Sequence, residues 1–368
     1  MMGLFKKTRL TAYSSPYQTP AVELIEVDGS RGEGGGQILR TAVAFSVIEG
    51  KAVKVRKIRA GRDPPGLKRQ HVSVLQVLAK VFGGELTGAT EGSGTVTFVP
   101  GRGGSRIVSV DMGTAASITL VLQAVVPAVA LTRSSLELHL VGGTDVPWSP
   151  TYDYFDRVVR EAYQSIGIRF ETAAARRGYY PQGGGRVSAS IEPTESVSPM
   201  DLTTRIEIPG VRLLSRCARL PRHVAERQVS SAADVLEKSG LKILEASAKE
   251  EEADSPGSSI LVYCTGAGAF LGADSIGSRG KRAEEVGADA AERFATGARS
   301  GAVLDANLAD MVLPLLAFAP SPSKLVVPAV TSHLRSGLEL AVQFTGCSWS
   351  AESRDEAVVV NINPRGDG

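Results

Sequence analysis

The sequence has few cysteines, and neither sign of charge dominates it. Its 368 residues include only three cysteines, Cys217, Cys264 and Cys347, and none of them forms a C-x-x-C pair. This number and spacing exclude a disulfide framework and a cysteine-type zinc site. Lys and Arg number 41 against 39 Asp and Glu, so the global charge predicts no partner.

Long hydrophobic runs are also missing. The most apolar run, Ile118–Leu131, contains Gln123 and Pro127 and is shorter than the roughly 18 residues that a membrane span needs. We therefore interpret it as a buried core helix and expect no membrane association. Residues 1–20 are polar and basic and hold no apolar stretch long enough for a secretory signal. We interpret them as a mobile extension of a cytoplasmic protein, or as the product of an initiation site chosen too far upstream.

The composition is that of a chain with a buried core. Hydrophobic residues make up 43% and charged residues 22%, with a mean hydropathy of +0.01, which excludes wholesale disorder. Aromatic residues are scarce, at 5%, whereas 40 glycines and 19 prolines are scattered along the chain. This pattern predicts short elements joined by tight turns and excludes a collagen-like or coiled-coil chain.

An internal repeat organises most of the chain. Residues 21–100 read as strand, helix, strand, helix and hairpin, and residues 105–193 repeat that order at a spacing of about eighty residues. A third copy begins at Asp201 and continues only from the helix at 304–318. Ordinary alternation of strands and helices is the alternative explanation.

The segment that interrupts the third copy differs in composition. Residues 209–302 contain an acidic run and a helix-like stretch at 281–299, which indicates an inserted small α/β domain. We therefore predict an α/β (α+β) protein with a large domain of three repeated units, made of residues 21–208 and 303–368.

The densest motif is DGSRGEGGGQILR at residues 28–40. Glycines 34–36 allow a sharp turn that places bare N–H groups at a helix N-terminus, where the dipole favours an anion such as a nucleotide phosphate. Gln37 and Arg40 share a face of that helix, and Glu33 precedes them. A purely structural turn is the alternative. The pattern is neither a dinucleotide fingerprint nor a Walker A loop.

Positive charge is concentrated in residues 51–70. Eight basic residues stand there against the single acid Asp63. Such a stretch attracts phosphate groups and can hold them through guanidinium forks. A solvated strand face is the alternative explanation.

Of the four histidines, His333 is the strongest candidate for chemistry. It follows Thr331 and Ser332 at a strand-to-helix junction, where a neutral imidazole can act as a nucleophile toward phosphorus. A cap-region residue is the alternative for a histidine at a helix start. His71 begins a helix and is either a cap-region residue or a substrate contact, whereas His139 lies in an alternating strand and is interpreted as structural.

Taken together, these segments resemble the RNA 3′-terminal phosphate cyclase family from about Val22 to Ile362. The matching stretches are DGSRGEGGGQILR, IRAGRDPPGLKRQH, GTAASITLVLQAVVPA, VGGTDVPWSP, GYYPQGGG, LPRHVAER, LADMVLPLLA and SHL. The resemblance implies three units of a four-stranded sheet and two helices, as in the enolpyruvyl transferases, with a small domain inserted in the third.

The resemblance also implies a reaction. ATP adenylylates a histidine, matched by His333, and AMP then passes to the 3′-phosphate of RNA, which closes to a 2′,3′-cyclic phosphate. The residues that match the family's nucleotide and phosphate contacts are Glu33, Gln37, Arg40, Arg59, Arg62, Gln70 and Asp310. Either Glu33 or Asp310 is assigned to the divalent metal, Mg²⁺ or Mn²⁺, or to orienting the His333 ring.

The sequence departs from the family near the nucleotide site. Leu334-Arg335-Ser336-Gly337 replaces the usual Leu-x-Thr-Asn, Asn307 stands where an aromatic is common, and Met311 where a glutamine is. We expect RNA 3′-phosphate ends as the partner, with no DNA requirement and a dimer as the candidate assembly. A non-catalytic RNA-processing or ribosome-assembly scaffold on the same fold is the alternative function.

Overall fold

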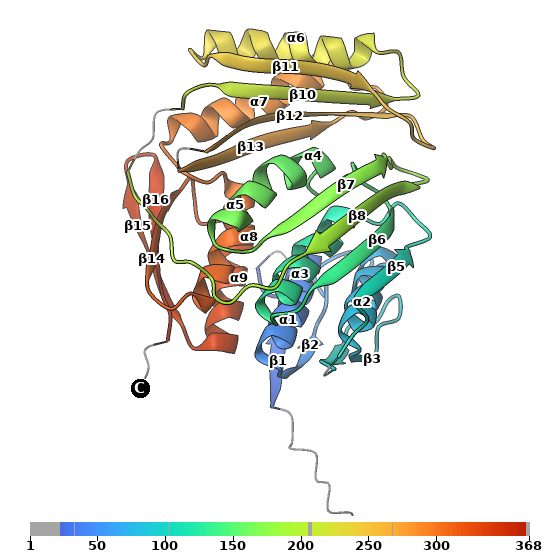
Figure 1. Ribbon diagram of the computed structural model, residues 1–368, viewed down its shortest axis with the longest axis vertical. Coiled ribbons are helices and arrows are strands. Elements are labelled where there is room, and N and C mark those ends of the chain that lie inside the picture. The colour runs from blue at the N-terminus through green and yellow to red at the C-terminus, as the bar shows by residue number, and fades with distance from the viewer. Residues whose placement is uncertain (1–22, 33, 102, 205–207, 267, 366–368) are drawn as a thin grey trace, which may run out of the picture.

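The β-strands of the protein form four sheets of four strands each (Figure 1). The computed structural model describes residues 23–365, with gaps at residue 33, residue 102, residues 205–207 and residue 267. The predicted mobile extension, residues 1–20, lies outside the described residues.

The first sheet has the strand order β1-β2-β4-β3. Its strands are Leu24–Asp28 (β1), Ala52–Arg56 (β2), Glu85–Thr87 (β3) and Val96–Val99 (β4). Helix α1 (Gly36–Glu49) follows β1, and helix α2 (Arg69–Phe82) follows β2. Strands β1 and β2 are parallel and end opposite each other, at Asp28 and Arg56. The two loops that lead into α1 and α2 therefore leave the sheet at the same end of its strands.

The second sheet repeats this arrangement with the order β5-β6-β8-β7. Its strands are Ile107–Asp111 (β5), Leu136–Gly142 (β6), Phe170–Arg176 (β7) and Gly185–Ile191 (β8). Its helices are α3 (Ile118–Leu131) and a continuous helical segment made of α4 (Tyr152–Tyr154), the π-helical turn η1 (Phe155–Val159) and α5 (Arg160–Ser165).

The third sheet is assembled from distant parts of the chain. Its strands are Asp201–Leu202 (β9), Ser323–Val327 (β14), Ser348–Arg354 (β15) and Ala357–Asn363 (β16). Its helices are α8 (Ala306–Val312), the 3₁₀-helix η2 (Leu313–Phe318) and α9 (Ser332–Thr345). From β9 the order is β9-β14-β16-β15, a parallel pair followed by two antiparallel pairs, as in the first two sheets. The likeness to enolpyruvyl transferases stays a prediction.

The fourth sheet has a different order, β11-β10-β12-β13. Its strands are Val211–Ala218 (β10), Ile243–Glu250 (β11), Gly257–Gly266 (β12) and Ala269–Ile276 (β13), and its helices are α6 (His223–Lys238) and α7 (Ala283–Arg299). The helices pack on this sheet and share a hydrophobic core with it. All six elements fall within residues 209–302, and the division into domains at those limits stays a prediction.

The core of the larger body is built around α3. Val121, Leu122 and Val125 are fully buried, and α3 contacts both α1 and α2. The run Ile118–Leu131 is therefore a core helix, as predicted. Among the described residues, no helix has the length and apolar character needed to cross a membrane.

Candidate functional site

The N-termini of α1, α2 and α9 converge at one place. The glycine-rich loop before α1 lies against α9, because a Cβ atom at Gly32, whose φ is +57°, would stand 2.2 Å from the Ser336 hydroxyl. Gln37, in the first turn of α1, contacts His333, in the first turn of α9. The fold thus brings together two predicted site residues that are 296 positions apart.

Gln37 determines which nitrogen of His333 carries the proton. Its amide Nε2 donates to the backbone carbonyl of His333 over 3.2 Å, which turns its Oε1 toward the ring Nδ1, where a second hydrogen bond forms. Because an amide oxygen only accepts hydrogen bonds, Nδ1 must be the protonated nitrogen. Nε2 of His333 then holds the lone pair, as a nucleophile requires.

Asp310 holds the helix that carries His333. The Thr331 hydroxyl accepts a hydrogen bond from the Leu334 N–H over 2.8 Å and so caps α9. The same hydroxyl donates to Oδ1 of Asp310 over 2.6 Å. Asp310 lies on α8, so this contact fixes the start of α9 against the preceding helix.

Arg40 and His71 meet at Gly36. A Cβ atom at Gly36 would stand 2.5 Å from two atoms of the His71 ring and 3.0 Å from Nη1 of Arg40, so only glycine fits there. Burial lowers the pKa of Arg40 to about 10. Arg40 is half-buried, and its guanidinium is a cation that can bind an anion such as a phosphate.

His71 is held neutral in this surrounding. Its Nδ1 accepts a hydrogen bond from the Lys68 backbone N–H over 3.0 Å, which leaves the proton on Nε2, the atom nearest Gly36. Burial lowers the pKa of His71 to about 4, and the charges of Arg40, Arg59 and Lys68 lower it further in the same direction. His71 is therefore a residue of the helix start, one of the two alternatives left open by the sequence, and its role as a substrate contact stays a prediction.

The remaining predicted contacts surround this centre in different ways. Arg59 is only 6% exposed, and its Nη1 donates to the carbonyls of Pro64 and Gly66, so it braces its own loop. Arg62 and Gln70 are exposed on the same loop and on the first turn of α2. Glu33 lies outside the described residues.

A cavity of about 40 Å³ lies between α1, α3 and α8, with room for about one water molecule. Gln37, Arg40 and Asp310 line it together with Gln123. Gln123 was not predicted as a site residue, although a lone glutamine in an otherwise apolar core helix was a visible signal.

The described residues contain no group of three His, Cys, Asp or Glu side chains arranged to hold a metal ion. A Mg²⁺ ion that binds through one or two carboxylates and substrate phosphates does not need such a group. Three features together form a site that suits a phosphate. They are the first N–H groups of α1, which have no side-chain cap at Gly35, the half-buried Arg40 and the neutral His71.

Comparison with known proteins agrees with this description. Residues 31–351 match the family model described as RNA 3′-terminal phosphate cyclase. The chain belongs to the RNA 3′-terminal phosphate cyclase family. Relatives named RNA 3′-terminal phosphate cyclase include one from Caldivirga maquilingensis, 40% identical over 93% of this chain and 98% of the relative. Another, from Methanopyrus kandleri, is 39% identical over 94% of this chain and all of the relative, and one from Pyrococcus furiosus is 41% identical over 88% and 94%.

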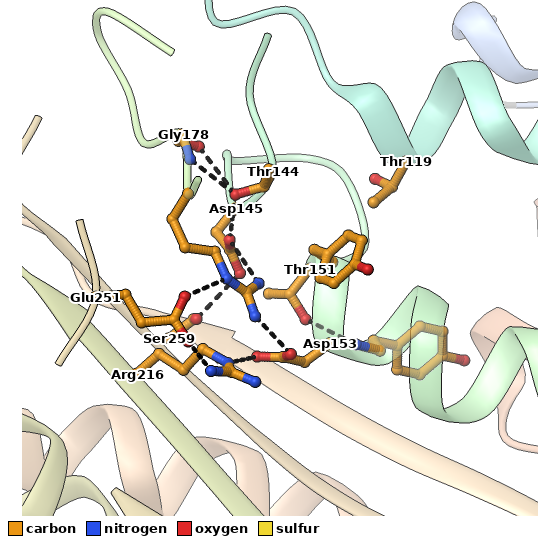
Figure 2. Close-up of polar contacts among 12 residues, drawn as sticks. Thr119, Thr144, Asp145, Thr151, Asp153, Gly178, Arg216, Glu251 and Ser259 are labelled. Atoms are coloured by element: carbon orange, nitrogen blue, oxygen red, sulfur yellow. Dashed lines mark hydrogen bonds and ion pairs between the residues drawn. The ribbon is translucent and has the colours of Figure 1, made fainter. Parts of the chain in front are cut away.

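In this member of the cyclase family, residues in and beside two of the matching motifs take part in a buried ionic network (Figure 2). Arg177 is 2% exposed and pairs with Asp145 at 3.3 Å, with Asp153 at 2.6 Å and with Glu251 at 3.0 Å. Arg216, on β10, also pairs with Asp153 and Glu251. The network therefore joins the loops of the second sheet to the fourth sheet.

The charges in this network compensate each other. Burial by itself would lower the pKa of Arg177, but Asp145 and Asp153 outweigh it and raise that pKa above its ordinary value. Burial would likewise raise the pKa of Asp153, but Arg177 and Arg216 outweigh it and lower that pKa. We assign the network a structural role, because its charged groups are all satisfied by one another.

Proposed function

We propose that the protein is an ATP-dependent RNA 3′-terminal phosphate cyclase in which His333 carries a covalent nucleotide. The observation that supports this most is the pair of hydrogen bonds between Gln37 and His333, which leaves the lone pair on Nε2 beside a site suited to phosphate. Family membership supports the same activity.

In the first step, Nε2 of His333 attacks the α-phosphorus of ATP. An N–P bond forms, the P–O bond to the β-phosphate breaks, and pyrophosphate leaves. The ring gains positive charge as Nε2 donates its lone pair to phosphorus. Oε1 of Gln37 accepts a hydrogen bond from the Nδ1–H group and stabilises that charge. Gln37 thus both selects the tautomer and assists the attack.

The cations of the site neutralise the triphosphate. We propose Arg40, Arg59, Arg62 and Gln70 as its contacts, with the first N–H groups of α1 and the Nε2 proton of His71 in addition. A divalent ion, Mg²⁺ or Mn²⁺, would supply further charge neutralisation between phosphate oxygens, and Glu33 or Asp310 is the proposed carboxylate ligand.

In the next steps the nucleotide passes to RNA. An oxygen of the RNA 3′-phosphate attacks the phosphorus bound to His333, the N–P bond breaks, and an RNA-adenylate forms. The neighbouring 2′-hydroxyl then attacks the activated 3′-phosphorus and loses its proton, while AMP leaves. The product is a 2′,3′-cyclic phosphodiester.

The test is labelling with ATP that carries ³²P at the α-phosphate, in the presence of Mg²⁺, followed by a denaturing gel. We expect an acid-labile label on the wild-type chain and none on His333→Ala, with both proteins folded by circular dichroism. Label on His333→Ala would remove this residue from the mechanism. A wild-type chain that binds RNA but takes no label would be a scaffold on the same fold.

A further inference from the structure

Two large aromatic side chains are exposed on neighbouring loops of the second sheet. Trp148 is 96% exposed and Tyr180 is 69% exposed, in a chain with only 5% aromatic residues. They lie in the motifs VGGTDVPWSP and GYYPQGGG. The first motif contains Asp145 of the ionic network, and Arg177 directly precedes the second. Neither ring has a role in the proposed function.

The backbone at Trp148 adds a second observation. Its φ is +69°, in the left-handed region, which is an outlier for a bulky residue. Conformations of this kind are energetically costly for a bulky residue and concentrate at functional sites. Burial of the ring does not offset this cost, since almost the whole side chain faces solvent.

The two loops are tied together beneath the rings. The Thr144 N–H donates to the Gly178 carbonyl over 2.8 Å, and Asp145 and Tyr179 form an isolated parallel bridge. Trp148 lies three residues after one partner of this bridge, and Tyr180 directly follows the other. The buried Arg177–Asp145 pair fixes both loops from below.

Contacts between neighbouring loops connect the Tyr180 turn to the first turn of α2. In the first turn of α2, next to Gln70, the Arg69 guanidinium lies over Gly113, where a Cβ atom would stand 4.0 Å from its Nη2. The loop after Gly113 supports the turn that carries Tyr180, because a Cβ at Gly183 would stand 2.8 Å from the Thr114 carbonyl oxygen. That turn is closed by the Gly183 N–H, which donates to the Tyr179 carbonyl over 2.8 Å.

We propose that Trp148 and Tyr180 stack on unpaired bases of the RNA strand whose 3′-phosphate lies at His333. This inference rests on the proposed function. Planar rings at the surface bind single-stranded bases of any sequence by stacking, and cations beside them hold the backbone. Arg69 and Arg186 are both exposed. Arg69 lies in the first turn of α2, and Arg186 follows the Tyr180 turn at the start of β8.

Fluorescence tests the contact directly, because the chain has only two tryptophans. Trp349→Phe leaves Trp148 as the sole tryptophan, and Trp148→Phe leaves Trp349. We expect a ten-nucleotide single-stranded RNA with a 3′-phosphate to quench the tryptophan emission of Trp349→Phe until binding is saturated. The emission of Trp148→Phe should stay unchanged. Unchanged Trp148 emission while fluorescence anisotropy of labelled RNA shows binding would overturn the inference, and absence of RNA binding would overturn it together with the proposed function.

Kinetics separate the two proposals. For the same RNA, Trp148→Ala and Tyr180→Ala should each raise KM about tenfold or more, with a smaller effect on kcat, and Trp148→Phe should restore most of the loss. Ile107→Ala, which removes an exposed hydrophobic side chain at the opposite end of β5, is the matched control. RNA-free labelling with ATP reports whether each variant is folded at the nucleotide site.

The outcomes are distinguishable. If the wild-type chain takes the label and cyclises RNA while Trp148→Ala and Tyr180→Ala keep the wild-type KM, the stacking surface is wrong and the proposed function stands. If the wild-type chain neither takes the label nor cyclises RNA, the proposed function fails, and the stacking inference fails with it.

Discussion

At the scale of single residues, Gln37 is the side chain on which the candidate chemistry most depends. One amide makes two hydrogen bonds to one histidine, and their directions leave a single tautomer. Second partners of this kind orient an imidazole and increase its basicity, and their loss costs roughly 10- to 100-fold in comparable histidine sites.

We predict that Gln37→Leu lowers the rate of covalent labelling by ATP about 10- to 100-fold, because Nδ1 loses its acceptor and the ring is free to take the other tautomer. Gln37→Glu keeps an acceptor oxygen for Nδ1 and should recover part of the rate. The measurement is single-turnover labelling. Gln343→Leu is the matched control, because it removes an exposed glutamine that donates to the Glu26 carbonyl from the far end of α9, the helix that carries His333. Equal rates for Gln37→Leu and wild type would contradict the assignment.

His71 gives the candidate site a dependence on pH. Its folded pKa of about 4 lies below the ordinary value of 6.5, chiefly because of burial. Between these two values the unfolded chain binds a proton at this position that the folded chain does not. Stability therefore falls as the pH is lowered from 6.5 toward 4, by up to about 3 kcal/mol from this group.

We predict that His71→Gln loses less stability than wild type when the pH is lowered from 7.5 to 4.5, because glutamine has no proton to take up. The measurement is the free energy of unfolding in urea at both pH values. His139→Gln, at an exposed position on β6, is the matched control. Parallel pH profiles for His71→Gln and wild type would show that His71 is not held neutral by the fold.

At the scale of elements, the first turn of α9 positions the nucleophile. Thr331 links two groups at this point: the Leu334 N–H of its own helix and the Asp310 carboxylate of α8. A helix start that is capped and anchored in this way holds His333 at a fixed distance from α1. Loss of the cap would fray the turn that carries the ring.

We predict that Thr331→Val lowers the free energy of unfolding by about 1 kcal/mol and slows labelling by ATP, because the cap and the donor to Asp310 are lost together. Thr331→Ser keeps both hydrogen bonds and should behave as wild type. Urea unfolding and labelling rates are the measurements. Thr345→Val, at the other end of α9, is the control for losing a threonine hydroxyl on this helix. A slowed Thr345→Val would show that the effect is general to the helix.

Elements were the most predictable level, because local patterns determine them. The helices expected at 118–131 and 281–299 are found at Ile118–Leu131 and Ala283–Arg299. The contact between Gln37 and His333 could not be predicted, since it joins residues far apart in sequence and depends on how α1 and α9 pack. The hydrogen bonds of Arg59 could not be predicted either. Its backbone is left-handed, with φ of +52°, and its guanidinium binds carbonyls of its own loop.

At the scale of the whole molecule, the buried ionic network joins the fourth sheet to the second. Arg177 is charged and buried, so removing it would leave Asp145 and Asp153 without their main partner. Removing one partner of a buried ion pair lowers the free energy of unfolding by about 3–5 kcal/mol, whereas an exposed ion pair contributes about 0–1 kcal/mol to it.

We predict that Arg177→Met destabilises the protein by about 3–5 kcal/mol and increases proteolytic cleavage at the loops that lead into and out of β10–β13. Arg227→Met is the matched control, since it removes an exposed arginine bound to Glu284 by two hydrogen bonds. We expect that control to change stability far less, because solvent screens an exposed ion pair. Urea unfolding and limited proteolysis are the measurements. Equal losses for the two variants would contradict a docking role for the network.

The pairing of β9 with β14 has a consequence for biosynthesis. Asp201 and Leu202 lie opposite Lys324 and Leu325, and the whole fourth sheet is encoded between them. During translation, α6, α7 and β10–β13 can fold as soon as they emerge from the ribosome, whereas β9 must wait for a partner made more than 100 residues later. Because such distant pairings form slowly, the third sheet should be the last to assemble. The helix that carries His333 would therefore be placed only after β14 has been made.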